Sequence, residues 1–355
     1  MSVPFQVGVL QLSMEPVQET VEMAEACDDA GFDSFWLAEA YPWWRKHSFE
    51  ARSSTSTSVL CARATENINI GWGIVSPYTR HPVQLAMEAR VVQDHADGRF
   101  LLGLGASKIF MKHSGEGETG ISASPATTMR EAVEIIESVI AGEDVDYSGE
   151  AFTAELPPLT DDTDCGSREV PIYFGATGPV LQQMAGEITD GLLTASITTH
   201  GFVEHSRENM VEGAREAGKD PEDVDLGSVI VGSIHESDSD KGKQGAREMA
   251  SMYLANKVQN IRGSADKILE NAGLTFEEIE PIAEAMERGG RKAAAEAVTD
   301  SVLEKVSPIA GTPTECIDRI KEFKDAGCTH ILLEIWGDDR PQQARLFGEE
   351  VLPHV

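Results

Sequence analysis

The chain has 355 residues, of which 41% are apolar, and its 60 acidic and 29 basic side chains give a formal net charge of −31. A chain of this length can bury a core without disulfides or metals, and it contains neither an apolar run of about 18 residues nor a signal peptide. We therefore expect a cytoplasmic protein, with no nucleic-acid or membrane partner, because an acidic surface repels phosphate backbones and anionic lipid.

The acidic excess is spread along the chain instead of being concentrated in a tail. High net charge of one sign destabilises the compact state unless salt screens the repulsion. We interpret the composition as that of a salt-adapted, halophilic protein, and an acidic mesophilic protein is the alternative.

Cysteine and histidine give no sign of a metal or disulfide framework. The histidines never pair at ligand spacing, and no C-x-x-C is present among the five cysteines at positions 27, 61, 165, 316 and 328. We expect Cys27, Cys61 and Cys316 to be small buried apolar side chains in a reducing compartment, and we expect no metal.

The first third of the chain alternates strands and helices. Apolar runs predict strands at Phe5–Leu12 and Ser34–Ala38, separated by a helix that begins at Pro16 and ends at Gly31. An aromatic and basic loop from Pro42 to His47 precedes a helix predicted over Phe49–Ala64.

The next stretch combines a strand, a glycine kink and a polar turn. Ile68 to Ile70 is a short β-branched run, and glycines follow it at 71 and 73. Glycine in a strand marks a bulge, a bend or a close approach of backbone to a ligand. Pro82 then suits the first turn of a helix. A strained turn without a ligand is the alternative interpretation.

The same alternation continues to the end of the chain. Further strands are predicted at Arg99–Gly103, Val170–Phe174, Gly191–Ala195, Gly227–Ile234 and Thr329–Ile335. The helices between them are predicted at Val83–Ala96, at Pro125–Ala141, from Gly178 to Ile188, over 202–217, from Pro313 to Gly327, and after Pro341. Residues 143–168 show no clear periodicity, whereas 238–306 are almost wholly helical in pattern.

Eight strands alternating with helices predict an α/β protein with a (β/α)8 TIM barrel. We expect a single domain over residues 1–355, with a helical insertion at about 238–306 between strands 7 and 8. A doubly wound open sheet is the alternative, although it does not account for a loop rich in polar residues or glycine after nearly every strand.

Chemistry in such a barrel belongs in the loops after the strands. Glu39 at a strand end is a candidate acid or base, with an ion-paired carboxylate as the alternative. Three of the loops are rich in glycine, which lets backbone N–H groups approach an anion, and a helix start at Gly178–Pro179 adds a favourable dipole. The pattern suggests an elongated, phosphorylated cofactor lying across the mouth of the barrel.

Basic residues beside these loops strengthen the expectation of an anion site. Arg80, His81 and Lys108 stand beside glycine-rich segments in an otherwise acidic chain. A structural ion pair is the alternative for Arg80, and a solvated surface lysine is the alternative for Lys108.

Three segments carry a family resemblance: Gly73-Ile74-x-x-Pro77-Tyr78-Thr79-Arg80-His81-Pro82; Pro171 through Gly191; and Ala310 through His354. They resemble the bacterial-luciferase-like superfamily, and within it the coenzyme F420-dependent 5,10-methylenetetrahydromethanopterin reductases. The resemblance covers nearly the whole chain.

The resemblance implies a deazaflavin, coenzyme F420, held across the barrel mouth, with FMN as the alternative cofactor. It also implies a non-prolyl cis peptide at Gly73–Ile74 that bulges toward the deazaflavin ring. The cofactor-binding residues expected are Gly73, Ile74, Val75, Thr79, Gly103, Gly105, Ala106, Ser107, Lys108, Gly175, Ala176, Thr177, Gly178 and Pro179.

The activity implied is one-carbon chemistry, in which a hydride passes between the deazaflavin and a C1-carrying pterin or folate. We expect Glu39 and Gln11 to be catalytic, Trp43 and Thr177 to contact the substrate, and the chain to form a homodimer or homotetramer. The sequence departs from its relatives at three positions. Ala40 stands in place of the His of an Asp-His pair, Leu10 in place of a Glu, and Thr177 in place of a Gln.

Three other functions fit the same sequence. The barrel could use F420 on an alcohol or sugar, or it could be an FMN-dependent, luciferase-like monooxygenase. A catalytically silent flavin-binding barrel is the alternative that is not an enzyme.

The charge of the chain predicts a salt dependence. Because the Debye length falls to about 3 Å at 1 M salt, molar salt screens the repulsion among the excess carboxylates. We expect the melting temperature, followed by calorimetry, to rise from low to molar salt. A melting temperature that stays flat or falls over this range would contradict the halophilic interpretation.

Overall fold

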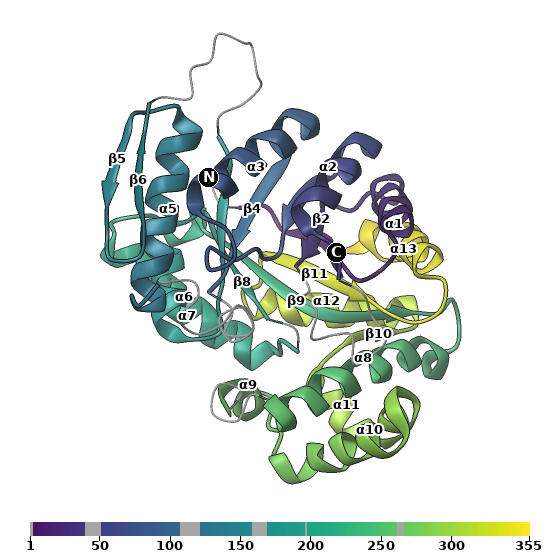
Figure 1. Cartoon of the computed structure of the whole chain (residues 1–355). Coiled ribbons are helices and arrows are strands. Elements are labelled where there is room, and N and C mark those ends of the chain that lie inside the picture. Colours follow the sequence, from purple (N-terminus) through teal and green to yellow (C-terminus); the bar gives the residue numbers. More distant parts are fainter. Residues whose placement is uncertain (1–2, 40–50, 107–120, 158–168, 196, 261–265) are drawn as a thin grey trace.

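Alternating strands and helices close into a parallel barrel (Figure 1). The computed structural model describes residues 3–39, 51–106, 121–157, 169–195, 197–260 and 266–355. Its barrel strands are β1 (Gln6–Leu12), β2 (Ser34–Ala38), β3 (Asn69–Trp72), β4 (Phe100–Leu104), β7 (Ile172–Gly175), β8 (Gly191–Thr194), β9 (Asp225–Ile234) and β11 (His330–Ile335). Neighbours pair in that order, and β9 pairs with β11, which pairs with β1. This closure confirms the predicted (β/α)8 barrel and excludes the open sheet.

Helices surround the barrel and cover its strands (Figure 1). They are α1 (Val17–Asp29), α2 (Ser54–Ala64), α3 (Pro82–Ala96), α5 (Pro125–Ala141), α6 (Pro179–Ile188), α7 (His200–Glu216), α12 (Pro313–Asp325) and α13 (Arg340–Glu350). A capping box starts α12, since Thr312 and Glu315 bond each other's backbone N–H groups. The largest apolar cluster of the protein lies between these helices and the strands.

The predicted helical insertion follows β9, the seventh barrel strand, and precedes α12. It consists of α8 (Ser239–Asn260), α9 (Asp266–Asn271), α10 (Phe276–Ala297) and α11 (Asp300–Val306). In Figure 1 these helices gather at one side of the barrel, and their apolar side chains form a second buried cluster. A short strand that the sequence pattern did not predict, β10 (Ile309–Gly311), pairs with β9 and links the insertion to the sheet.

The helix predicted over Phe49–Ala64 was drawn too long at its start. Within the described residues, α2 begins at Ser54, and the side chain of Ser53 accepts a hydrogen bond from the N–H of Ser56. Serine at the N-cap marks the start of a helix, because its hydroxyl accepts a hydrogen bond from a backbone N–H of the first turn that has no partner within the helix. The Ser/Thr run therefore marks the boundary that the apolar pattern missed.

Part of the segment without periodicity forms a hairpin that the sequence pattern did not reveal. Strands β5 (Val145–Ser148) and β6 (Thr153–Leu156) pair in antiparallel fashion beside α5. Their turn is held by the buried carboxylate of Glu131 on α5, which accepts the N–H groups of Glu150, Ala151 and Phe152. This contact between distant residues fixes the turn, and a short-range pattern cannot contain it.

The inside of the barrel is filled by large side chains set against glycine. Its cluster comprises Leu10, Trp36, Ala38, Tyr173, Leu193, Val229 and Leu332. A Cβ at Gly71 would lie 2.3 Å from the Trp36 ring, and one at Gly191 would lie 2.3 Å from the Tyr173 ring. These glycines leave the space that the two aromatic rings occupy, so the interior is a packed core and not a pore.

A buried polar network crosses the amino end of the barrel. Asp225 Oδ2 lies 3.0 Å from His330 Nδ1, and His330 Nε2 lies 2.7 Å from Ser34 Oγ, which also accepts the indole N–H of Trp36. Burial alone raises the pKa of Asp225, but His330 and hydrogen bonds from Thr329 and Tyr173 outweigh it and leave that pKa below its usual value. The network joins the starts of β2, β9 and β11, so its role is structural although it holds Ser, His and Asp.

The buried cysteines behave as the sequence analysis expected. Cys27, Cys61 and Cys316 are buried with free thiols, and Cys328 is buried in the same way. Burial raises the pKa of Cys61 and of Cys316 to about 12, so neither thiol is a ready nucleophile. Cys165 lies outside the described residues.

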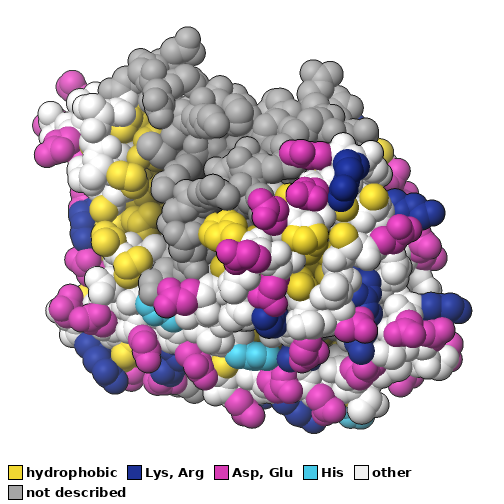
Figure 2. Space-filling view, turned by 90° about the horizontal axis from the view of Figure 1, so that it is seen from below, with side chains coloured by type: hydrophobic (Ala, Val, Ile, Leu, Met, Phe, Trp, Pro, Cys, Tyr) yellow, Lys and Arg dark blue, Asp and Glu magenta, His cyan; other side chains and the backbone are white. Residues whose placement is uncertain are grey.

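Acidic side chains are spread over the described part of the face in Figure 2, with basic side chains scattered among them. This distribution agrees with an acidic excess that is spread along the chain. Among the described residues, no helix has the length and apolar character that crossing a membrane requires.

The buried network predicts a stability loss that depends on pH. Asp225→Asn removes the acceptor charge beside His330, and breaking a buried pair lowers the free energy of unfolding by about 3 kcal/mol at neutral pH. Because the folded-state pKa of Asp225 is lowered, its contribution is present above its unfolded pKa of about 3.9 and is lost as pH falls through the folded value.

The difference between wild type and Asp225→Asn should therefore shrink below about pH 4, as measured by denaturant unfolding in molar salt. Asp325→Asn, at an exposed position on α12, is the matched control and should behave as wild type. A difference that stays constant down to pH 3.5 would show that the Asp225 charge does not stabilise the fold.

Candidate functional site

The kink after β3 lies at the carboxyl end of the barrel, where active sites of this architecture form. The peptide bond between Gly73 and Ile74 is cis, as predicted, and both residues are half-buried. The kink is tied to both neighbouring strands, since Gly73 N–H donates to the Leu37 carbonyl and Val75 N–H donates to the Gly103 carbonyl, each at 3.0 Å.

Three glycines, from β4, the turn after β4 and β7, surround the Ile74 side chain. A Cβ added at Gly105 would lie 2.7 Å from Ile74 Cδ1, and one at Gly175 would lie 2.6 Å from Ile74 Cγ2. A Cβ at Gly103 would meet the Trp72 carbonyl oxygen at 2.0 Å and Ile74 at 3.4 Å. The structure thus brings four predicted cofactor residues together, and the glycines make room for Ile74 as well as for a ligand.

Other predicted cofactor residues reach the site with their backbone more than with their side chains. Val75 and Ala176 are buried and pack in the layer between the barrel and its helices. The Thr79 hydroxyl donates to the Ser76 carbonyl at 2.9 Å and so stabilises its own turn. Ala106 is half-buried at the end of the described part of its loop.

The start of α6 offers free backbone donors. Gly178 is the N-cap of α6 and has no side chain to accept the first helical N–H groups, and Pro179 follows at the first helical position. Both are exposed, and a Cβ added at Gly178 would meet nothing within 4 Å. With half-buried Thr177 beside it, this terminus has the donors and the open space that an anion requires.

The predicted acid or base at the end of β2 is engaged in an ion pair. Glu39 accepts two hydrogen bonds from the Arg80 guanidinium, at 2.7 and 2.8 Å, and Glu88 lies 3.6 Å from the same guanidinium. The hydrogen bond to Glu39, together with the charges of Glu39 and Glu88, raises the pKa of Arg80 despite its partial burial. A bidentate pair of this kind holds both groups in place, which favours the ion-paired alternative for each of them.

The remaining basic and aromatic predictions divide into two groups. His81 is the N-cap of α3, where its Nδ1 accepts the Val83 N–H, so its ring serves the helix start. Trp43, Ser107 and Lys108, predicted for substrate and cofactor binding, lie outside the described residues, as does Ala40.

Gln11, predicted to be catalytic, points away from the barrel interior. Side chains alternate along a strand, and Leu10 belongs to the interior cluster, so Gln11 faces the surrounding helices. Its amide donates to Glu15 at 3.2 Å and to Thr20 at 3.4 Å. The geometry gives no support to a catalytic role for Gln11.

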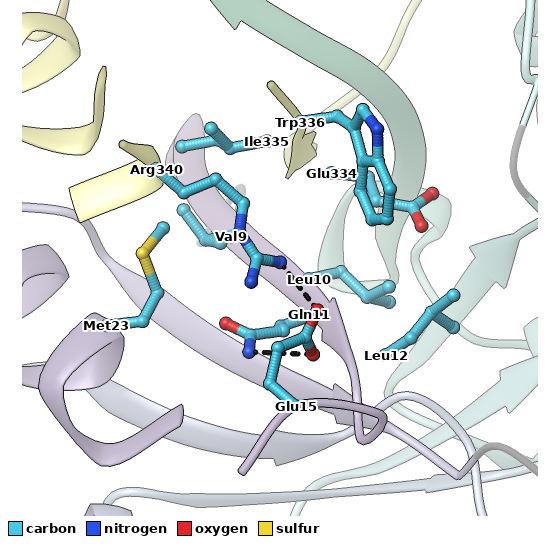
Figure 3. A pocket seen from close by; sticks show the side chains of 10 residues that line it. All are labelled: Val9, Leu10, Gln11, Leu12, Glu15, Met23, Glu334, Ile335, Trp336 and Arg340. Carbon is cyan, nitrogen blue, oxygen red and sulfur yellow. Dashed lines mark hydrogen bonds and ion pairs between the residues drawn. The ribbon is translucent and has the colours of Figure 1, made fainter. Parts of the chain in front are cut away.

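A pocket opens between the ends of β1 and β11 (Figure 3). It is lined by Val9, Leu10, Gln11, Leu12, Glu15, Met23, Glu334, Ile335, Trp336 and Arg340. Gln11 and Arg340 turn toward Glu15, which pairs with Arg340 at 2.9 Å, while the Glu334 carboxylate points away from them. Glu334 is only 3% exposed, and both its oxygens lie 3.0 Å from the Tyr253 hydroxyl of α8.

Sequence reasoning missed Glu334, although a signal for it was present. It is the one acid in the run Ile331-Leu332-Leu333-Glu334-Ile335, and it stands two residues after Leu332, which faces the barrel interior. A period of two therefore places the carboxylate on the inner face of β11. Its partner Tyr253 comes from the insertion, a pairing that no local pattern contains.

Within the part of the chain that the structure describes, no group of three or more His, Cys, Asp or Glu side chains is arranged to hold a metal ion. The chemistry visible at the mouth is thus a half-buried apolar bulge, a set of backbone donors, the Glu39–Arg80 ion pair and the buried carboxylate of Glu334.

Comparison with known proteins adds a consistent set of similarities. Residues 1–330 match the family model described as luciferase-like monooxygenase. The chain is 32% identical to a 5,10-methylenetetrahydromethanopterin reductase of Archaeoglobus fulgidus over 94% of each chain. It is 30% identical to the reductase of that name from Methanopyrus kandleri, over 98% of this chain and 97% of the other. The solved structure of the coenzyme F420-dependent tetrahydromethanopterin reductase from Methanopyrus kandleri superposes with a TM-score of 0.86, at 27% identity and 99% coverage of both chains.

Proposed function

The chain belongs to the luciferase-like monooxygenase family, and from this premise we propose that it is a coenzyme F420-dependent oxidoreductase that reduces a C1-carrying pterin. The observation that carries the proposal is similarity over the full length, at 30% identity or more, to proteins named 5,10-methylenetetrahydromethanopterin reductase. The structural match at a TM-score of 0.86 to an F420-dependent reductase supports the same cofactor.

The residues at the barrel mouth fit a deazaflavin. Ile74 presents a half-buried apolar side chain, which suits the face of a flat aromatic ring, and Gly103, Gly105 and Gly175 support it from below. The first turn of α6, beginning at Gly178, would hold the phosphate through backbone N–H groups. When bound in its reduced form, the deazaflavin supplies a hydride.

The protein's own part in this reaction is to position and to exclude water. The apolar interior beneath the mouth includes Leu10, Trp36 and Ala38, so a substrate lying there is shielded from solvent on that side. The Glu39–Arg80 pair fixes the end of β2 against the turn after β3 and keeps the mouth in one shape. Positioning of this kind contributes much of the rate when the cofactor supplies the chemistry.

The substrate is expected to be the methylene form of tetrahydromethanopterin, which the names of the relatives specify. Methylenetetrahydrofolate carries the same C1 unit between two nitrogens and is the other candidate. Leu10 and Thr177 are the positions at which the family resemblance implies a glutamate and a glutamine, so they are where the substrate contacts of this chain would differ.

We expect anaerobic titration in molar salt to show saturable binding of coenzyme F420 and much weaker binding of FMN, followed by fluorescence. The protein should then oxidise reduced F420 when methylenetetrahydromethanopterin is added. The folate analogue, tested in parallel, should react more slowly if the pterin is the native substrate.

Three other outcomes of the titration would contradict part or all of the proposed function. Preference for FMN, with turnover that requires oxygen, would replace the reductase with a monooxygenase. Tight F420 binding without turnover on either C1 carrier would contradict the proposed reaction, whereas the assignment of F420 as the cofactor would stand. Binding of neither flavin would overturn the proposed function.

The anion site at α6 can be tested by charge. Gly178→Asp places a preferred N-cap residue at the helix start, so the melting temperature should equal or exceed that of wild type. The same carboxylate repels a phosphate, and we expect F420 affinity to fall by about tenfold, equivalent to about 1.4 kcal/mol.

Gly178→Asn is the matched control, because it caps the helix equally well, has the same shape and carries no charge. Titration at the lowest salt that keeps the protein folded limits screening of the effect. Equal F420 affinity in the Asp and Asn variants would show that the F420 phosphate does not bind at this end of α6.

A further inference from the structure

We propose that Glu334 is the acid that protonates the substrate nitrogen during hydride transfer, and that Tyr253 positions it. The inference rests on the proposed function and deepens it, because it assigns the proton transfer to a residue on β11. Neither residue was singled out by the sequence patterns. Both are identified by where the fold places them.

Glu334 lies on the inner face of the barrel, close to its mouth. The β1–β11 ladder pairs Gly8 with Leu332 and Val9 with Leu333, so the next residues, Leu10 and Glu334, occupy neighbouring positions. Leu10 and Leu332 both belong to the barrel interior, and Glu334 continues their face toward the mouth. Among the described strand residues of the carboxyl half of the barrel, Glu334 is the one carboxylate on the inner face.

The other candidate residues near the mouth are not available as a proton donor. Glu39 is held by two hydrogen bonds to Arg80, and Gln11 faces the surrounding helices and does not titrate. At the same level of β1 the inner-face side chain is Leu10, which has no proton to give. Glu334 on the adjacent strand is therefore the acid at this level of the inner face.

The Glu334 carboxyl is buried and held in one direction. Glu334 is 3% exposed, and apolar Leu10, Leu12 and Trp336 line the pocket with it. A carboxyl that is buried at the mouth and held in one direction can act as a general acid once a substrate nitrogen comes within hydrogen-bond reach. The Tyr253 hydroxyl, 3.0 Å from both oxygens, fixes the direction of the carboxyl.

The charged groups near Glu334 do not duplicate its role. Of the described residues lining the pocket, Glu15 from the turn after β1 and Arg340 from α13 are the other charged ones, and they pair with each other at 2.9 Å. The Tyr253 hydroxyl from α8 contacts the Glu334 carboxylate directly. Figure 3 shows the Glu15–Arg340 pair on the opposite side of the strand end from the Glu334 carboxylate.

The proton and electron count is complete. Glu334 gives its proton to the nitrogen that leaves the C1 carbon, as that C–N bond breaks and its electron pair passes to the nitrogen. The carbon receives the hydride and is reduced by two electrons, while the deazaflavin is oxidised by two. Glu334 then regains a proton from solvent, which receives the one proton released on oxidation of the cofactor.

The first experiment compares Glu334→Gln with wild type. F420 affinity should stay within about twofold, whereas kcat with methylenetetrahydromethanopterin should fall by about 100-fold, the range of a lost general acid. The decline of wild-type kcat at high pH should be absent in the variant, and Glu334→Asp should restore that decline with part of the rate. An unchanged kcat and pH profile in Glu334→Gln would overturn the assignment while leaving the proposed function standing.

The second experiment tests Tyr253 as a positioning residue. Tyr253→Phe removes a hydrogen bond that favours the ionised carboxylate, so the decline in kcat should move to higher pH. Glu131→Gln is the control, because Glu131 is a buried carboxylate that bonds only the backbone of the β5–β6 turn among the described contacts. It should lower the melting temperature and leave the pH profile unchanged. A profile that does not move in Tyr253→Phe would contradict its role.

A third readout is independent of turnover. Covering a carboxylate with an aromatic ring displaces water and favours its protonated form, so F420 binding should be accompanied by proton uptake. Calorimetry in two buffers of different ionisation enthalpy measures that uptake, which Glu334→Gln should abolish. Equal uptake in both proteins would place Glu334 away from the ligand. If wild type binds no F420, the proposed function and this inference both fail.

Discussion

Packing around one isoleucine organises the mouth of this barrel. Ile74 leaves the end of β3 through the kink at Gly73 and fills space that glycines of β4, β7 and the turn after β4 leave open. Because a side chain at Gly105 or Gly175 would take the place of Ile74, the three strands are shaped around it. Glycine in this site therefore has a packing role that comes before any role in binding.

Large side chains also pack against glycines deeper in the barrel. Deeper in the interior, Trp36 fits against Gly71 and Tyr173 against Gly191, and the amino end is held by hydrogen bonds around Asp225 and His330. That network contains the side chains of a hydrolytic triad, yet it is fully buried at the end opposite the mouth. Its position and burial identify it as structural, which shows why residue types alone do not define an active site.

At the open end, the site combines rigid and reactive parts. The Glu39–Arg80 pair and the packing of Ile74 hold the strand ends, the uncapped start of α6 offers donors to an anion, and Glu334 contributes a buried carboxylate. These features come from β2, β3, β7, α6 and β11, so no single segment carries the site. The insertion contributes to it as well, through the Tyr253 hydroxyl of α8.

The sequence by itself determined the fold class, the helical insertion, the Gly73–Ile74 kink and most of the element boundaries, because hydrophobic period, proline and glycine act over short distances. It missed the β5–β6 hairpin and misplaced the start of α2, where one depends on Glu131 of another element and the other on a serine cap. Tertiary structure alone decided that Glu39 meets Arg80, that Gln11 turns away from the interior and that Glu334 meets Tyr253. These pairings join residues far apart in the chain, and barrel closure brings them together.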